Sequence, residues 1–555
     1  MKLSKICSAT LLIFLISSCA LDQMARKYDT VKFTTTPEIL ETHGGKVNLK
    51  LNTEFEENYF AKKATVEFTP VLVYEGGEKA FKSITVQGED ATGGEATIFK
   101  AAGGNFNYND AIDYNDNMYN SRLELRATAK IKDKEKTLGP VDISQGVIAT
   151  STRVQDNEIL GNLNHGYQHI SFDEEIATIY FLVNQSNIRT TEKSDEDIKA
   201  LKKFAKKGYK THSIEIISYA SPEGSVNIND NVSENRMNST VNYTKRLLRS
   251  LKVDGANNKD LYNITSVGED WDGFENLIDN SNLKDKNVIN RIVNSIEDVN
   301  EREQQIRDLA EIYEAVENDI LPQLRKATIK IKSFEPKRTD EEIATLSTTK
   351  PEELDIKELL FAATLTDDIN VKKDIYNNAV TLHNDWRGYN NIACLYISDG
   401  NDEKALEFLS KAEKIGGKTS DILTNRGIIA ARNGELNKAQ KLFDQAKTSE
   451  HNQAILDIRQ GEYNKAARFY KGKTSYNAHL SRLLNGDSSY GNINNQGCEG
   501  NYLNAVMMNR KGNDDLALIN LDKLISSCPE YKEQAANDLE FLNLRSNEKF
   551  IEMTK

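Results

Sequence analysis

The 555-residue chain is poor in the residue types that most metal sites and catalytic nucleophiles require. Its five cysteines, seven histidines and two tryptophans are scattered rather than grouped. It contains no HExxH, no CxxC pair, no GxSxG and no glycine-rich phosphate loop, so the familiar signatures of zinc hydrolases, serine hydrolases and nucleotide-binding enzymes are missing. We therefore expect a protein that is not an enzyme, with no catalytic residue, no bound metal and no cofactor.

Long apolar runs are also missing after the first twenty residues. The net charge is −13, and acidic and basic residues are mixed rather than segregated into blocks. This balance argues against a polyanionic partner, so we expect no binding of nucleic acid. The length exceeds what one hydrophobic core usually supports, which predicts about three to four domains.

The first residues have the order of a secretory signal. Lys2 and Lys5 precede the apolar run 11–16, which ends in the small residues Ser17 and Ser18 before Cys19. This run is too short for a membrane-spanning helix, which needs about 20 apolar residues. An ordinary cleaved signal and a short anchor helix are the alternatives to a modified cysteine.

Small residues directly before Cys19 resemble the bacterial lipobox. The resemblance implies that residues 1–18 are removed as a signal peptide, that Cys19 is acylated with palmitate-type chains, and that residues 19–30 form a lipid anchor and tether. Three acyl chains are enough for stable membrane attachment. The sequence after Cys19 lacks the acidic cluster expected of surface-exported lipoproteins, which favours an outer-membrane protein facing the periplasm.

Residues 31–150 alternate short β-branched or aromatic runs with glycine-rich breaks. Examples are residues 47–51, 65–68 and 123–127, and the period-2 alternation predicts an all-β sandwich. Pro70 interrupts one run and suggests a sheet edge or a strand break there. A linker is expected over residues 151–172.

Residues 173–337 change to strands separated by helices, in the order βαβαββ. The predicted strands cover residues 176–183, 213–219, 262–267 and 326–334. The predicted helices cover residues 194–207 and about 232–251. A helical insertion is expected at 274–321, before the last strand.

The segment that follows the second of these strands is similar to the OmpA-like peptidoglycan-binding domain, in the variant common in envelope proteins of the Bacteroidota. The similarity rests on the strand ending at Tyr219, the loop Ala220-Ser221-Pro222-Glu223-Gly224, Asn229, and the helix opening with residues 233–236. It implies that the domain binds the diaminopimelate of the wall peptide.

Four residues are the ligand-binding candidates that this resemblance implies. Arg236 matches the arginine that pairs with the ligand carboxylate, and Asn229 matches a polar loop position. The family's loop aspartate is replaced by Ser221, although Glu223 could supply the charge from a shifted position. Two readings stay open: Arg236 binds the wall peptide, or Arg236 pairs with Glu223 or Glu234 and the domain is a protein-binding module.

The last third, residues 355–555, repeats itself after a linker at 338–354. The small residues and glycines of 393–412 recur 34 positions later, at 427–446, and further units begin near Gly461 and Gly512. This period is that of tetratricopeptide repeats, which implies an all-α solenoid whose concave face binds an extended peptide. Candidate contacts are Asn390, Asn391, Asn425 and Arg426.

The positions of the cysteines within the repeats also predict which of them are paired. Cys498 and Cys528 fall at positions that a helical hairpin brings together, so we expect a disulfide between them in an oxidising compartment. Cys394 lies inside a predicted helix and is expected to be a buried free thiol.

Taken together, the modules predict an outer-membrane-anchored periplasmic scaffold. In this hypothesis the lipid holds the membrane, the central domain holds peptidoglycan, and the repeats recruit protein partners of an envelope assembly or secretion machine. The alternative is a lipoprotein interaction module, related to fimbrial or nutrient-uptake assembly, whose central domain no longer binds peptidoglycan.

Overall fold

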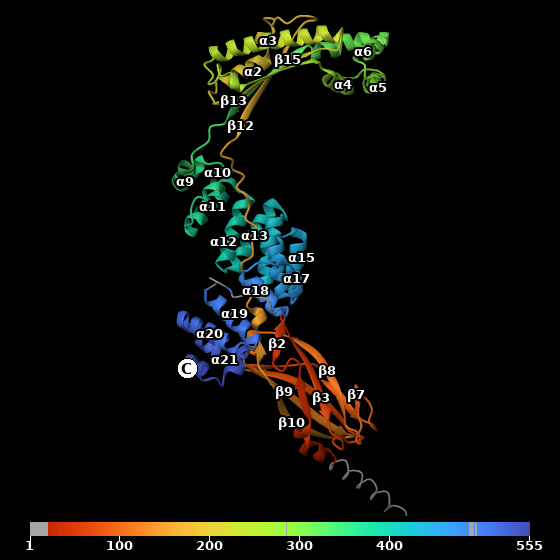
Figure 1. Ribbon diagram of the computed structural model, residues 1–555, viewed down its shortest axis with the longest axis vertical. Coiled ribbons are helices and arrows are strands. Elements are labelled where there is room, and N and C mark those ends of the chain that lie inside the picture. The colour runs from red at the N-terminus through yellow and green to blue at the C-terminus, as the bar shows by residue number, and fades with distance from the viewer. Residues whose placement is uncertain (1–19, 285, 488–492, 494–496) are drawn as a thin grey trace, which may run out of the picture. The chain divides into compact units, whose positions relative to one another are not determined.

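The computed structural model describes residues 20–284, 286–487, 493 and 497–555. It divides into two compact units. One combines the chain up to Asn164 with Asp368–Lys555, and the other is His165–Asp367. The β-rich and helical ends of the chain therefore belong to one unit, and the central module is inserted between them in sequence (Figure 1).

The β-rich region is built from two sheets around one core. One sheet has the strand order β1-β3-β2-β11, with β8 also paired to β3, and the other has the order β10-β9-β4-β6-β7, with β5 also paired to β4. Strict alternation of exposed and buried residues along β3 shows why these strands form, since every second side chain enters the core. The strands are β1 (Lys32–Thr35), β2 (Leu40–His43), β3 (Lys46–Phe55), β4 (Thr65–Tyr74), β5 (Gly77–Ala80), β6 (Ile84–Gly88), β7 (Ala96–Ile98), β8 (Gly104–Asp113), β9 (Ser121–Ile131), β10 (Lys134–Gln145) and β11 (Val147–Ile148).

Two local expectations about this region are wrong. Strand β4 is not broken at Pro70, nor is it an edge. It pairs with β6 up to Phe68 and with β5 from Val71, so the break lies in its neighbour, opposite the residue that has no N–H to donate. Residues 20–30 are not a free tether either, because residues 20–26 are helical and Leu21, Met24 and Tyr28 are buried in the sandwich core.

The inserted unit contains a four-stranded sheet with the order β12-β15-β13-β14. Strands β13 and β14 are parallel, whereas β15 runs antiparallel to both β12 and β13. Helices α2 and α3 pack against the buried residues of this sheet, including Ile214, Ile216, Ile329 and Ile331. The elements are β12 (Phe172–Tyr180), α2 (Glu196–Ala205), β13 (Thr211–Ala220), α3 (Val226–Ser250), β14 (Tyr262–Glu269) and β15 (Lys326–Phe334).

The first strand of the sheet is shifted from the predicted range 176–183 and is partly exposed. β12 ends at Tyr180 and is an edge strand, and Ile176, Leu182 and Val183 are substantially exposed. Helix α3 begins at Val226, six residues before the expected start. The left-handed φ of Gly224 ends the loop, and polar residues 227–231 are helical despite their weak propensity.

The expected helical insertion is present between β14 and β15. It comprises α4 (Trp271–Asn280), α5 (Lys286–Ser295), α6 (Val299–Arg307), α7 (Ala310–Ala315), a π-helical turn (Val316–Ile320) and α8 (Leu321–Leu324), which share a small core of their own. The supposed linker at 338–354 is mostly helical. α9 (Asp340–Thr349) starts with a capping box between Thr339 and Glu342, and α10 (Ile356–Ala362) follows it within the same unit.

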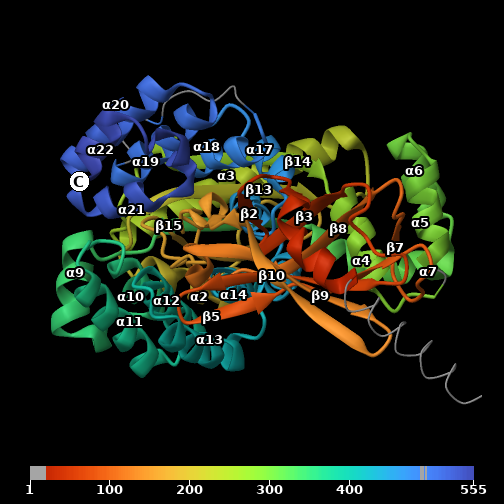
Figure 2. The ribbon, with the colours of Figure 1, turned by 90° about the horizontal axis from the view of Figure 1, so that it is seen from below.

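The carboxy-terminal region is entirely helical and consists largely of antiparallel pairs (Figures 1 and 2). Gly400 and Gly434 adopt left-handed φ at equivalent turns, as the 34-residue repeat predicts. The helices are α11 (Ile369–His383), α12 (Trp386–Ser398), α13 (Asp402–Gly416), α14 (Ser420–Arg432), α15 (Leu436–Ala446), α16 (Glu450–Arg459), α17 (Tyr463–Phe469), α18 (Tyr476–Leu484), α19 (Gly497–Arg510), α20 (Asp514–Ser527), α21 (Lys532–Asn537) and α22 (Glu548–Thr554).

Candidate binding sites

Residues 153–164, which we call the strap, run in extended form along the carboxy-terminal helices. We expected a linker here, yet five asparagines of these helices bind the main chain of the strap. Asn425 accepts a hydrogen bond from the Gly161 N–H (2.8 Å) and donates to the Gly161 carbonyl (3.1 Å). Asn452 holds Ile159 in the same way at 2.7 and 2.8 Å.

Two further asparagines extend this ladder in both directions. Asn477 binds the N–H and carbonyl of Gln155, both at 3.0 Å, and Asn391 accepts from the N–H of Leu163 at 3.1 Å. The residues held all have odd numbers because alternate residues of an extended chain face the same side. The ladder reads main-chain groups, so it selects an extended conformation rather than particular side chains.

Two ion pairs and the tight packing around one glycine make the contact depend on particular residues of the strap. Arg432 pairs with Glu158 at 2.7 Å, and Arg459 pairs with Asp156. The Glu158 side chain is only 1% exposed. A Cβ on Gly161 would lie 2.6 Å from the Asp421 carbonyl oxygen, so this position admits only glycine without rearrangement.

The predicted contact residues of the repeats are partly correct. Asn391 and Asn425 bind the strap, and Asn390 donates to the Gly161 carbonyl at 2.7 Å. Arg426 does not touch the strap and instead pairs with Glu413 at 3.0 Å. Their occupant is the protein's own chain, where we had expected a separate peptide.

Sequence reasoning missed Asn452, Asn477, Arg432 and Arg459. A signal was present, since asparagine recurs in the first half of α12, α14, α16 and α18. Another asparagine, Asn504 of α19, binds both main-chain groups of Ile493, at 2.8 and 3.0 Å. The same two-bond contact between an asparagine side chain and one residue's main chain therefore recurs outside the strap.

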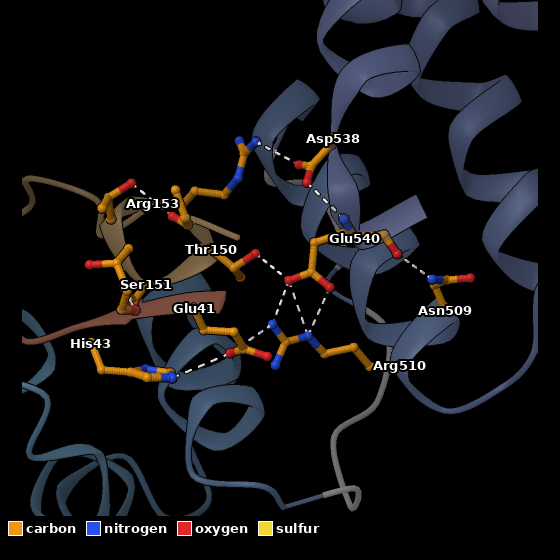
Figure 3. A network of polar contacts seen from close by, with 12 residues as sticks. Glu41, His43, Thr150, Ser151, Arg153, Asn509, Arg510, Asp538 and Glu540 are labelled. Carbon is orange, nitrogen blue, oxygen red and sulfur yellow. Dashed lines mark hydrogen bonds and ion pairs between the residues drawn. The ribbon is translucent and has the colours of Figure 1, made fainter. Parts of the chain in front are cut away.

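A polar network joins the β-rich region to the helices within the same unit (Figure 3). Arg510 pairs with Glu540 at 2.6 Å and with Glu41 of β2 at 3.4 Å. Thr150 donates to the Glu540 carboxylate, and Glu41 also contacts His43. Burial raises the pKa of Glu540, and the neighbouring Arg510 partly offsets this rise. Because the Glu540 carboxylate is buried and Arg510 pairs with both it and Glu41, the network fixes the two regions to each other.

In the inserted unit, Arg236 is poorly accessible to a ligand carboxylate. It is 1% exposed and sits ten residues after the start of α3, rather than in its first turns. Its guanidinium donates to the carbonyls of Gln185 (3.0 Å), Tyr219 (2.9 Å) and Leu182 (3.1 Å). Burial, together with the charge of Arg325, lowers the pKa of Arg236 to about 10. The expected pairing with Glu223 or Glu234 is wrong.

Ser221 and Glu223 form a separate cluster beside this arginine. Ser221 donates to Glu223 at 2.6 Å, and Arg325 holds the Glu223 carboxylate through two hydrogen bonds of 2.8 and 3.1 Å. The glutamate that could have replaced the missing loop aspartate is therefore already neutralised. Arg325, just before β15, was not singled out in the sequence.

Asn229 belongs to a second cluster of polar residues, which includes residues of the helical insertion. It lies in the first turn of α3, not in the loop, and donates to Glu269 at 2.8 Å. Glu303 of α6 accepts from the Gly224 N–H at 3.0 Å and pairs with Arg307 at 2.5 Å. Burial and the charge of Glu269 raise the pKa of Glu303 to about 7. Besides Glu223 within loop 221–224, Glu303 thus binds the loop's main chain, and Glu269 is bonded to Asn229.

The cysteines are arranged as follows. A disulfide joins Cys498 and Cys528, whose Cα atoms are 6.2 Å apart. Among the described residues, the one group with the spacing of metal ligands is Cys498, Cys528 and Glu530, and the disulfide removes both thiolates from it. Cys394 is a buried free thiol whose pKa burial raises to about 12.

The anchor itself cannot be placed, since Cys19 lies outside the described residues. Within the described part of the chain, every helix is too short or too polar to cross a bilayer. The chain matches no protein-family model, and it shows no significant similarity to any curated protein.

Proposed function

We propose that this protein is a lipid-anchored binding scaffold of the bacterial outer membrane, facing the periplasm. The lipobox-like sequence at Cys19 supports the anchor, and the βαβαββ order of the inserted unit supports its resemblance to OmpA-like domains. The 34-residue repeat supports a tetratricopeptide-like arm that recruits envelope proteins. Each of these module types binds a membrane, a ligand or a protein, and none of them catalyses a reaction.

Within this role, we favour a central module that no longer binds the wall peptide. The observation that carries this choice is the engagement of Arg236 by three main-chain carbonyls in a buried site. A ligand carboxylate would have to displace those bonds, and the carboxylate that should meet its ammonium group is absent at Ser221. The module then serves as a protein-interaction domain.

Wall attachment remains the second candidate because of Glu269 and Glu303. Both carboxylates border the loop that carries Ser221, and one Glu303 oxygen has no hydrogen-bond partner among the described residues. A diaminopimelate ammonium group would find there the negative charge that the loop itself lacks.

Sedimentation of the mature protein with purified peptidoglycan separates the two. Our proposal predicts no cosedimentation above that of a carrier protein, for the parent and for Arg236→Ala alike. Binding that Arg236→Ala weakens about thirtyfold, the cost of a lost buried charge pair of about 2 kcal/mol, would establish wall attachment instead. Ser221→Asp should gain binding if only the loop carboxylate is missing, and equal melting temperatures exclude misfolding.

The anchor has its own test. Cys19→Ala should leave unprocessed precursor or release protein from the membrane fraction, whereas Cys7→Ala, in the amino-terminal part of the same signal, should not. Normal maturation and membrane fractionation of Cys19→Ala would contradict acylation.

A further inference from the structure

The face of the carboxy-terminal helices that carries the strap-binding asparagines is not a free peptide-binding surface. The strap lies along it, five asparagines bind the strap's main chain, and Glu158 is buried against Arg432. If the helices recruit a partner, as the scaffold role requires, the partner needs another surface. Such a surface would be a hollow that exposes apolar side chains outside the strap's path.

Such a hollow lies between α20 and α22, with a volume of about 830 Å³. The two helices contact each other, and Figure 2 shows them side by side. Its apolar lining residues are Leu518, Ile519 and Met553, of which Leu518 is buried. Ile519 is 60% exposed, and Leu516, one turn before it on α20, is 42% exposed.

The lining residues follow helical spacing on both sides. On α20 the residues at 515, 518, 519 and 522 lie on one face, and on α22 the residues at 549, 552 and 553 do the same. Two helices that present such faces to one hollow form the groove into which a third helix packs. Elsewhere in this region the same arrangement is filled, for example by α14 against α12 and α13.

The rim of the hollow carries a net negative charge. Asp515, Asp522 and Glu552 line it together with a single cation, Lys549. In the described part of the chain, none of these four residues takes part in an ion pair. An occupant with basic flanks would complement this rim, whereas an acidic one would be repelled.

We propose that the hollow between α20 and α22 is a docking site for an amphipathic helix of a partner protein, with an apolar stripe flanked by lysine or arginine. The stripe packs on Leu518, Ile519 and Met553, and the basic flanks face Asp515, Asp522 and Glu552. This inference rests on the proposed scaffold role, because it names the surface through which the helices recruit.

Two synthetic peptides of about 18 residues, roughly five helical turns, are the probes. Both carry leucine at i, i+3, i+4 and i+7, and their flanks are either lysine or glutamate. Fluorescence anisotropy with the full mature protein should show micromolar binding of the lysine peptide and at least tenfold weaker binding of the glutamate peptide. Ile519→Lys should weaken the lysine peptide at least tenfold, while Ile415→Lys, on the exposed face of α13, should not.

Several outcomes would overturn the proposal. These are equal binding of both peptides, undiminished binding to Ile519→Lys with an unchanged melting temperature, or no binding at all. Self-association of the parent that Ile519→Lys abolishes would assign the hollow to a second copy of the chain. Because the peptidoglycan experiment concerns only the inserted unit and the Cys19 experiment only the anchor, failure here is distinguishable from failure of the proposed function.

Discussion

Asn425 binds both main-chain polar groups of Gly161, a residue 264 positions earlier in the chain. This pair is the centre of a ladder that ties the strap to the helices, and it joins the first 164 residues to the last 188 within one compact unit. The unit is therefore discontinuous in sequence, and its cooperativity depends on contacts made across the insertion.

The first prediction is that Asn425→Ala destabilises this unit. The Gly161 N–H would stay buried without an acceptor, which costs about 2 kcal/mol in the free energy of unfolding. Asn390 still donates to the Gly161 carbonyl, so the loss should not be larger. Urea unfolding measures it, with Asn437→Ala on the exposed side of α15 as the matched control. Equal stability of both variants would show that the ladder contributes nothing.

A second prediction uses the glycine itself. In Gly161→Ala the new Cβ would lie 2.6 Å from a main-chain oxygen of α14, and this backbone cannot move without distorting the helix. We expect the strap to be partly released, with at least tenfold faster amide hydrogen exchange at residues 155–163. Gly139→Ala meets no atom within 4 Å and should leave exchange at the strap unchanged.

Features with a local cause could be predicted from the sequence, whereas features imposed by residues far away in the chain could not. The strand at 326–334 was predicted to the residue because its alternation is a local pattern, and the helix pairs around Gly400 and Gly434 follow from a repeated one. The strap has no periodicity of its own. Its conformation is imposed by side chains more than 220 residues away, as in the pair Leu163 and Asn391.

The same reasoning explains the errors at the candidate ligand site. Arg236 was placed correctly on the second helix, but its three acceptors come from residues 182, 185 and 219, and main-chain carbonyls leave no trace in a sequence. Arg325 neutralises Glu223 from 102 positions away, so no local motif links the two. Resemblance to a family gives the residue types, and the three-dimensional neighbours decide their roles.

The third prediction concerns the network around Arg510. Arg510→Met should cost about 3 kcal/mol in the free energy of unfolding, because the Glu540 side chain, 2% exposed, would keep a buried charge without its partner. The double variant Arg510→Met with Glu540→Leu should recover most of that loss, since an apolar pair needs no compensation. A double variant less stable than the single one would contradict this account.

The fourth prediction is chemical. Non-reducing peptide mapping of protein purified from an oxidising compartment should recover Cys498 and Cys528 in one linked peptide, and Cys498→Ser should cost about 3 kcal/mol for a loop of this length. Cys394 is the internal control: burial raises its pKa to about 12, so it should alkylate only after denaturation. Two free thiols at 498 and 528 would contradict the pairing.

The last prediction is a pH dependence set by Glu303. Burial and the neighbouring charge of Glu269 raise its pKa from 4.5 to about 7 in the folded protein. Between these two values the folded state holds a proton that the unfolded state has released, so the free energy of unfolding should fall as the pH rises from about 5 to 7. Arg307 and the Gly224 N–H, which also face this carboxylate, oppose the effect without abolishing it.

Glu303→Gln keeps the shape of the side chain and removes the titration. We expect this variant to be more stable than the parent at pH 8, by about 1 to 2 kcal/mol, and to show a flatter stability profile between pH 5 and 8. Glu301→Gln, on the exposed side of the same helix, should keep the parent's profile. Chemical denaturation at several pH values measures both. A parent whose stability rises with pH over this range, or a Glu303→Gln profile as steep as the parent's, would mean that α6 is held over loop 221–224 by other groups than this carboxylate.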